Sequence, residues 1–206
     1  MKVAIYGGSF DPIHIGHQKI IHYLLGQDYD RVIVMPTGLP LHKGRMASNS
    51  EHRLAMIGIA TSGLSDRLVI SSMEIDRVGP TDTIDTVREL RAGGYRESDL
   101  VFCLGSDSFA SLTSWPSWQN LIELIRFEVF IREGSGHGAD QVRQFLDNCY
   151  TKYSVKQGTI RYNLAEIGIP EVSSTRIRAD LEEFGRNNLD PRVLRYINQH
   201  GLYVQI

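Results

Sequence analysis

The sequence predicts an α/β fold, a doubly wound parallel sheet with helices on both faces and a small helical part at the C-terminal end. Short runs rich in β-branched residues alternate with longer segments of helical period along most of the chain. The chain has 206 residues, of which 42% are hydrophobic and 22% are charged. A chain of this length can bury a hydrophobic core without support from a metal or a disulfide. No composition shift or repeat divides it, so we expect a single domain over 1–206.

The expected elements follow in order from these runs. Five apolar runs are strand candidates, namely Val3–Tyr6, Arg31–Met35, Leu68–Ser71, Leu100–Leu104 and Phe127–Ile131, and a sixth candidate is Thr159–Ile167. Helices are expected at Ile15–Leu25, Glu51–Thr61, Thr83–Ala92, Ser117–Ile125 and Ala139–Asn148, with two more after Ser173 and Pro191. Three of the helices have capping signals by residue type, namely Ser117, Ser173 and the pair Asp190–Pro191.

Charge, hydropathy and cysteine use exclude several classes of protein. With a net charge of −2, the protein has no overall positive charge to attract a nucleic acid backbone, so no nucleic acid partner is expected. No apolar segment reaches the length of a membrane span, and the apolar run at the N-terminus is too short for a signal peptide. Cys103 and Cys149 have neither CxxC nor metal-ligand spacing. We therefore expect no membrane partner, a cytoplasmic location and two free thiols.

The most informative segment is GGSFDPIHIGH, Gly7 to His17, between the first expected strand and the first helix. Gly7 and Gly8 let the backbone approach a phosphate, and the following helix offers free N–H groups and the positive end of its dipole. His14 and His17 are three residues apart and share a face of that helix, within reach of neighbouring phosphoryl oxygens. The segment therefore predicts an anion site.

This segment also has other interpretations. A histidine pair also occurs in metal sites or as surface decoration, but no HExxH, cysteine pair or acidic cluster supplies further ligands, so no metal site is predicted. The dinucleotide fingerprint GxGxxG and the Walker loop are both absent. The glycine-rich stretch from Glu133 to Asp140 is typical of a mobile surface loop, with a nucleotide-binding loop as the alternative.

Two motifs resemble a known superfamily. GGSFDPIHIGH is similar to the first signature of the nucleotidylyltransferases, whose HxGH element is spelled here by His14 to His17. VSSTRIR, Val172 to Arg178, resembles their second signature of the form ISSTxIR and lies far downstream, as it does in the family. The resemblance implies a Rossmann-like fold and an enzyme that transfers a nucleotidyl group from a nucleoside triphosphate.

Further segments resemble the branch of this superfamily that adenylylates nicotinate mononucleotide. They are Leu39–Lys43 (LPLHK), Gly79–Val87, Gly105–Trp118 and Val193–Tyr203, and the likeness covers nearly the whole chain. The sequence departs from the pattern at Leu41, Asp82 and Pro116. The resemblance implies ATP-dependent adenylyl transfer to nicotinate mononucleotide in NAD biosynthesis, yielding deamido-NAD and pyrophosphate. Mg²⁺ would accompany ATP, held by phosphate oxygens rather than by a protein cage.

The resemblance also implies roles for individual residues. The catalytic charges would come from His14, His17, Lys43 and Arg178. ATP would contact Gly7, Gly8, Ser9, Phe10, His14, His17, Gly105, Asp107, Ser174, Thr175 and Arg178. The acceptor would contact His42, Lys43, Thr83 and Trp115, with the Trp115 ring stacked on the pyridine and N–H groups around Thr83 and Trp115 binding the carboxylate. Asp107 is also suited by type and position to bind ribose hydroxyls.

Simpler interpretations remain open for several of these residues. Trp115 could be a surface aromatic in a proline turn, Asp107 a helix N-cap, and Ser174 and Thr175 plain capping residues. Arg53 and Met56 are interpreted as structural. For the whole chain, the alternatives are a catalytically idle nucleotide sensor, or the same chemistry on nicotinamide mononucleotide or phosphopantetheine. The oligomeric state does not follow from the sequence.

Overall fold

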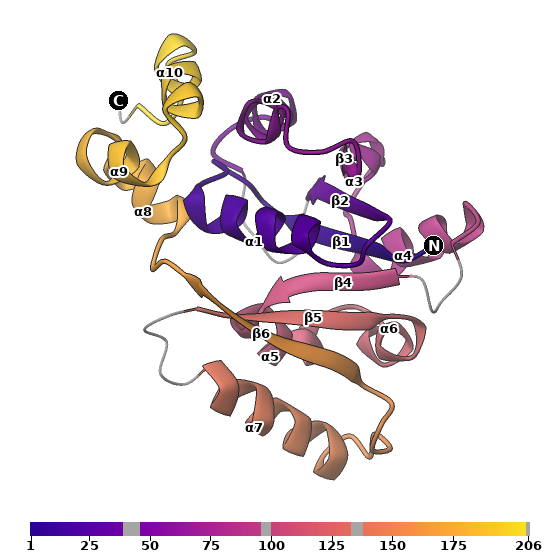
Figure 1. Cartoon of the computed structure of the whole chain (residues 1–206). Coiled ribbons are helices and arrows are strands. Elements are labelled where there is room, and N and C mark those ends of the chain that lie inside the picture. Colours follow the sequence, from indigo (N-terminus) through magenta and orange to yellow (C-terminus); the bar gives the residue numbers. More distant parts are fainter. Residues whose placement is uncertain (39–45, 96–99, 133–137, 205–206) are drawn as a thin grey trace.

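A computed structural model describes residues 1–38, 46–95, 100–132 and 138–204. One six-stranded sheet, with all neighbouring strands parallel, runs through it (Figure 1). The order is β3-β2-β1-β4-β5-β6, with β1 at Val3–Gly8, β2 at Arg31–Pro36, β3 at Leu68–Ile70, β4 at Leu100–Gly105, β5 at Arg126–Arg132 and β6 at Arg161–Ile169. The expected α/β fold and the sixth strand candidate are confirmed.

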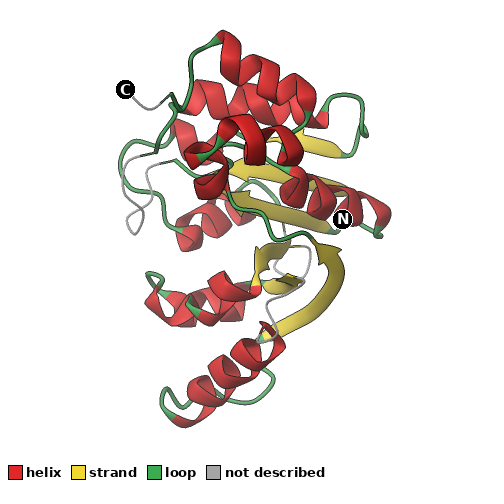
Figure 2. Cartoon of the chain, turned by 90° about the vertical axis from the view of Figure 1, so that its left-hand side faces the viewer, coloured by secondary structure: helices red, strands yellow, loops and turns green. Residues whose placement is uncertain are grey.

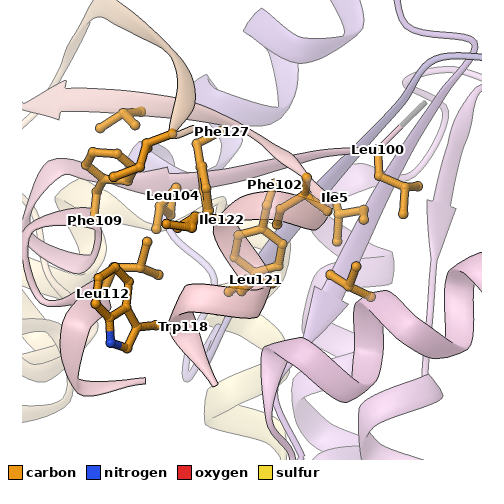
Figure 3. Close-up of a cluster of buried hydrophobic side chains, with 14 of the residues drawn as sticks. Ile5, Leu100, Phe102, Leu104, Phe109, Leu112, Trp118, Leu121, Ile122 and Phe127 are labelled. Atoms are coloured by element: carbon orange, nitrogen blue, oxygen red, sulfur yellow. The ribbon is translucent and has the colours of Figure 1, made fainter. Parts of the chain in front are cut away.

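The two faces of the sheet carry separate cores, because successive side chains of a strand point to opposite sides. Val3 and Ile5 of β1 face a core, part of which is shown in Figure 3, that is covered by α4 (Thr83–Ala92), α5 (Ser106–Ala110), α6 (Trp118–Leu124) and α7 (Gly138–Thr151). Ala4 and Tyr6 face the other core, covered by α1 (Ile15–Gly26), α2 (Ser50–Thr61), α8 (Ser174–Ala179) and α10 (Pro191–Gln199). Helices therefore flank the strands on both sides (Figure 2).

The strand order predicts where a ligand would bind. From β1 the chain builds outward through β2 and β3, then returns to place β4 on the other side of β1 and continues through β5 to β6. In such sheets, ligands bind beyond the carboxyl ends of the strands at the point where the order reverses. Here that point lies between β1 and β4, which end at Gly8 and Gly105.

The helix expected after Ser173 is shorter than its sequence period suggests. Ser173 caps α8 as expected, accepting from the Arg176 N–H at 3.2 Å. The helix ends at Ala179 because the Asp180 carboxylate accepts from the N–H groups of Glu183 and Phe184 and starts a new turn. That turn, η3 (Leu181–Gly185), leads into α9 (Arg186–Asn188).

Ser117 and Asp190 both stand at the N-cap positions expected of them, but only Asp190 caps its helix with its side chain. Ser117 has a left-handed backbone, φ 52°, and its side chain makes no capping hydrogen bond. Asp190 accepts from the Arg192 N–H at 2.8 Å ahead of Pro191. The short elements α3 (Met73–Asp76) and η2 (Leu112–Ser114) were not predicted, because they are too short for a period to show. None of the helices in the described ranges is long and apolar enough to cross a bilayer.

Candidate active site

His14 and His17 meet at the start of α1. His14 is the N-cap residue and is buried, and its backbone N–H donates to Nδ1 of His17 at 3.2 Å. The two imidazole rings stack with centroids 3.6 Å apart and planes inclined by 24°. Because Nδ1 of His17 accepts a hydrogen bond, neutral His17 carries its proton on Nε2. That Nε2–H can donate to a phosphoryl oxygen beside the N–H groups of the first helical turn.

Phe10 supports the histidines from the core. Its ring is 1% exposed and lies 4.9 Å from the His17 ring and 5.3 Å from the Tyr6 ring, measured between centroids. Its backbone adopts the left-handed region at φ 49°, which places the ring under the turn. The Phe10 side chain is therefore not a surface for a nucleotide, and any contact with ATP from this residue would come from its backbone.

The second motif is hydrogen-bonded directly to the first. The Ser174 hydroxyl donates to the Pro12 carbonyl at 2.9 Å, and Nη1 of Arg178 donates to the Asp11 carbonyl at 2.7 Å. Nη2 of Arg178 also reaches the Thr175 hydroxyl at 3.3 Å. Segments more than 160 residues apart in sequence thus lie against each other, and α8 stands beside the beginning of α1 (Figure 1). The guanidinium has five donors, so two bonds to the protein leave others for a phosphate.

Gly16, between the two histidines, is where the motifs touch. A Cβ at this position would lie 2.9 Å from Cγ1 of Val172 and 3.2 Å from the His14 ring. Val172 is 4% exposed and immediately precedes the Ser173 cap of α8. The glycine in HIGH is therefore required by the contact between the two motifs.

The Asp11 carboxylate is a buried junction that the sequence did not reveal. It is 2% exposed and accepts four hydrogen bonds, from the N–H groups of Ala47 (2.7 Å) and Ser48 (3.3 Å), the Ser48 hydroxyl (2.6 Å) and the Tyr203 hydroxyl (2.6 Å). The sequence suggested only a turn residue at this position, because these partners lie 36 to 192 residues away and no local spacing relates them.

Arg53 supports the same turn from α2. It is 2% exposed, and its Nη1 donates to the Ser9 carbonyl at 3.0 Å. Burial lowers the pKa of Arg53, while the charge of nearby Asp11 acts in the opposite direction. Met56, on the same helix, is fully buried in the core. Both placements agree with the structural roles expected for these residues.

His42 and Lys43 lie outside the described residues, but the chain on either side of them is held at the β1–α1 turn. Before the gap, the Thr37 N–H donates to the Gly8 carbonyl at 2.8 Å. After it, the Ala47 N–H donates to Asp11 at 2.7 Å.

At the end of β4, Gly105 leads directly to Asp107. Gly105 is the N-cap of α5, so Asp107 lies in the first turn of that helix and the N-cap interpretation of Asp107 is wrong. Its carboxylate is exposed and folds back over Gly105, where a Cβ would lie 2.5 Å from Oδ1. Asp107 is therefore accessible at the carboxyl end of β4.

Trp115 and Thr83 come from neighbouring elements on one side of the sheet. The half-buried Trp115 ring packs edge to face on Phe102 of β4, with centroids 6.1 Å apart. The backbone N–H of Trp115 donates to the Leu112 carbonyl at 2.9 Å. Contrary to expectation, this N–H is therefore already hydrogen-bonded within the turn and is not available to bind a carboxylate. Thr83 begins α4, where the first N–H groups have no partner within a helix.

Within the described ranges, no three His, Cys, Asp or Glu side chains gather in a way that could hold a metal ion. Both cysteines are buried free thiols. Protein donors already occupy the carboxylate of Asp11, the acidic residue of the first motif.

Comparison with known proteins gives consistent matches. Residues 5–180 match the family described as Cytidylyltransferase-like. A probable nicotinate-nucleotide adenylyltransferase of Neisseria meningitidis serogroup B is 34% identical over 204 residues, covering 98% of each chain. One from Mycobacterium bovis is 42% identical over 133 residues, covering 64% of this chain and 61% of that protein. The structure of Plasmodium falciparum nicotinic acid mononucleotide adenylyltransferase complexed with NaAD shares the fold, with TM-score 0.73, 22% identity and coverage of 98% of this chain and 97% of that chain.

Proposed function

The chain belongs to the cytidylyltransferase-like family, and we propose that it transfers the adenylyl group of ATP to nicotinate mononucleotide, giving deamido-NAD and pyrophosphate. Relatives that match it over nearly their whole length carry the name of this activity. The observation that carries the proposal is the pair of hydrogen bonds from Arg178 and Ser174 to the Asp11 and Pro12 carbonyls. These bonds place a guanidinium beside the helix start that bears His14 and His17.

The chemistry requires positive charge at this place. An oxygen of the acceptor 5′-phosphate forms a bond to the α-phosphorus of ATP, and the bond from that phosphorus to the oxygen bridging to the β-phosphate breaks. Both reactants are anions, so their repulsion must be offset before they meet in line. Nε2–H of His17, the N–H groups at the start of α1 and Arg178 would supply donors. Losing one such contact costs about 3 kcal/mol of barrier, roughly a hundredfold in rate.

The remaining ATP contacts follow from position at the carboxyl ends of β1 and β4. Backbone N–H groups of Gly7 to Phe10 would face the phosphates, and Asp107 would accept from ribose hydroxyls beyond Gly105. Thr175 would orient Arg178 by accepting its hydrogen bond, and Ser174 would hold the second motif against the Pro12 carbonyl of the first. Lys43, assisted by His42, would add charge at the triphosphate.

For the acceptor, we propose that the pyridine ring stacks on Trp115 and that its carboxylate binds the N–H groups at the start of α4, around Thr83. A helix N-terminus favours a carboxylate over a neutral amide, because the helix dipole places positive charge there. This favours nicotinate over nicotinamide mononucleotide as the acceptor.

We further propose Mg²⁺ as the metal that accompanies ATP. A divalent ion lowers the charge on the phosphates and helps pyrophosphate to leave. No carboxylate cluster is available in the described residues, so phosphate oxygens and water would provide its ligands. One domain over 1–206 and a cytoplasmic location remain predictions from the sequence.

Pyrophosphate release tests the proposal directly. The purified chain is incubated with ATP and Mg²⁺, and nicotinate mononucleotide, nicotinamide mononucleotide and phosphopantetheine are offered separately. We expect rapid release with the nicotinate compound and deamido-NAD as the product, and a loss of about a hundredfold in His17→Ala. Pyrophosphate release with phosphopantetheine and with neither mononucleotide would show that the acceptor is phosphopantetheine and would refute the proposed acceptor. ATP binding without release in any arm would favour a nucleotide sensor.

A further inference from the structure

Tyr203 lies near the C-terminal end, yet its hydroxyl reaches the first motif. It donates to Oδ1 of Asp11 at 2.6 Å and lies 3.1 Å from the Ser48 hydroxyl. The backbone carbonyl of the same Asp11 accepts from Arg178 at 2.7 Å. A continuous path of hydrogen bonds therefore joins the C-terminal segment, through one buried residue, to the guanidinium.

We propose that Tyr203 is a positioning residue for Arg178, acting through Asp11. Asp11 is held on its carboxylate side by Tyr203, Ser48 and Ala47, which fixes the peptide whose carbonyl orients Arg178. This inference rests on the proposed role of Arg178 at the triphosphate. It assigns a contribution to the site to a residue 192 positions from Asp11.

Two further properties of Tyr203 fit this role. Burial and the hydrogen bond to Asp11 raise the pKa of Tyr203 well above its usual range, so the hydroxyl keeps its proton and remains a donor at any physiological pH. Its backbone is in the left-handed region at φ 62°, which is uncommon for a bulky residue and costs on the order of 1 kcal/mol. The contacts of its side chain hold that conformation.

The chain provides a matched control. The hydroxyl of Tyr196, on α10, is hydrogen-bonded to Nδ1 of His52, on α2, at 2.9 Å. Tyr196→Phe therefore removes a comparable hydrogen bond between the C-terminal helices and α2, at a place that does not touch Asp11. Loss of stability alone would affect Tyr196→Phe and Tyr203→Phe alike, whereas a positioning role affects only Tyr203→Phe.

The test is a double-mutant cycle with Arg178→Ala, read by the Kd of ATP with Mg²⁺ and by kcat/KM for ATP. We expect Tyr203→Phe to weaken both by about tenfold in the wild-type background, since a small displacement of a catalytic group has effects of this order. In the Arg178→Ala background, Tyr203→Phe should have less than a twofold effect. Tyr196→Phe should leave both quantities within twofold of the wild type.

Several outcomes would overturn the inference. These are wild-type values in Tyr203→Phe, an undiminished effect in the Arg178→Ala background, or an equal loss in Tyr196→Phe. If Tyr203→Phe does not fold, Ser48→Ala removes another donor to Asp11 and is carried through the same cycle, with the same expectations. The ATP Kd separates this inference from the proposed function, because it is measured without an acceptor. If the wild type binds ATP but transfers nothing, the proposed function is refuted. The Kd values of the mutant cycle would still test the role of Tyr203.

Discussion

Replacing Gly16 with alanine tests whether contact between the two motifs assembles the site. The added Cβ would lie 2.9 Å from Cγ1 of Val172, about 0.5 Å closer than the 3.4 Å at which ordinary contact begins, and 3.2 Å from the His14 ring. Val172 is buried and β-branched, so it cannot rotate away freely. Overpacking of this kind costs about 1–3 kcal/mol, against a gain of about 1 kcal/mol for alanine over glycine in a helix.

The expected net loss is about 1 kcal/mol, or roughly 2–4 °C in Tm for a chain of this size. The effect on activity should be larger, because the displaced groups are His14 and the segment leading to Arg178. We expect kcat to fall by at least about tenfold. Thermal unfolding and pyrophosphate release measure the two effects on one protein preparation.

Gly26→Ala is the control, because Gly26 ends the same helix and a Cβ there would meet no atom within 4 Å. This variant should keep its activity and lose no stability. If Gly16→Ala matched it in both Tm and kcat, the contact between the motifs would not constrain the site and the reasoning would fail.

Three other substitutions address the charge, the acceptor pocket and a buried acid. Arg178→Lys keeps the charge but loses the planar fork, so kcat/KM for ATP should fall by about a hundredfold in steady-state assays, and a loss below threefold would contradict its role. Trp115→Ala should raise KM for nicotinate mononucleotide by about tenfold while KM for ATP stays within twofold; equal changes in both would argue against stacking. Burial raises the pKa of Glu74, although a hydrogen bond from Thr86 acts in the opposite direction. The folded state therefore disfavours the charged carboxylate, and the wild type loses stability as pH rises through that pKa. Glu74→Gln should therefore gain in Tm relative to the wild type between pH 4 and pH 8. The nearby charge of Arg77 and the Thr86 hydrogen bond act against burial, and a variant less stable at pH 8 would show that they outweigh it.

The sequence by itself determined the class of fold, the two motifs and the chemistry they imply. These features are local: strand and helix periods repeat within a few residues, and the predicted anion site rests on glycines and histidines within the eleven residues from Gly7 to His17. The caps predicted at Ser173 and Asp190 are confirmed, whereas Ser117 occupies the predicted N-cap position of α6 without a side-chain hydrogen bond.

Only the tertiary structure decided which distant groups meet. The bonds from Ser174 and Arg178 to the first motif, and those from Tyr203 and Ser48 to Asp11, join segments far apart in the chain. Nothing in local spacing predicts such pairs, because a tyrosine or serine of the same type could equally face solvent. The structure also showed that the Trp115 N–H is occupied, since its partner depends on how the turn closes. Local patterns thus specify the parts of the site, and packing of the two cores on the sheet specifies their arrangement.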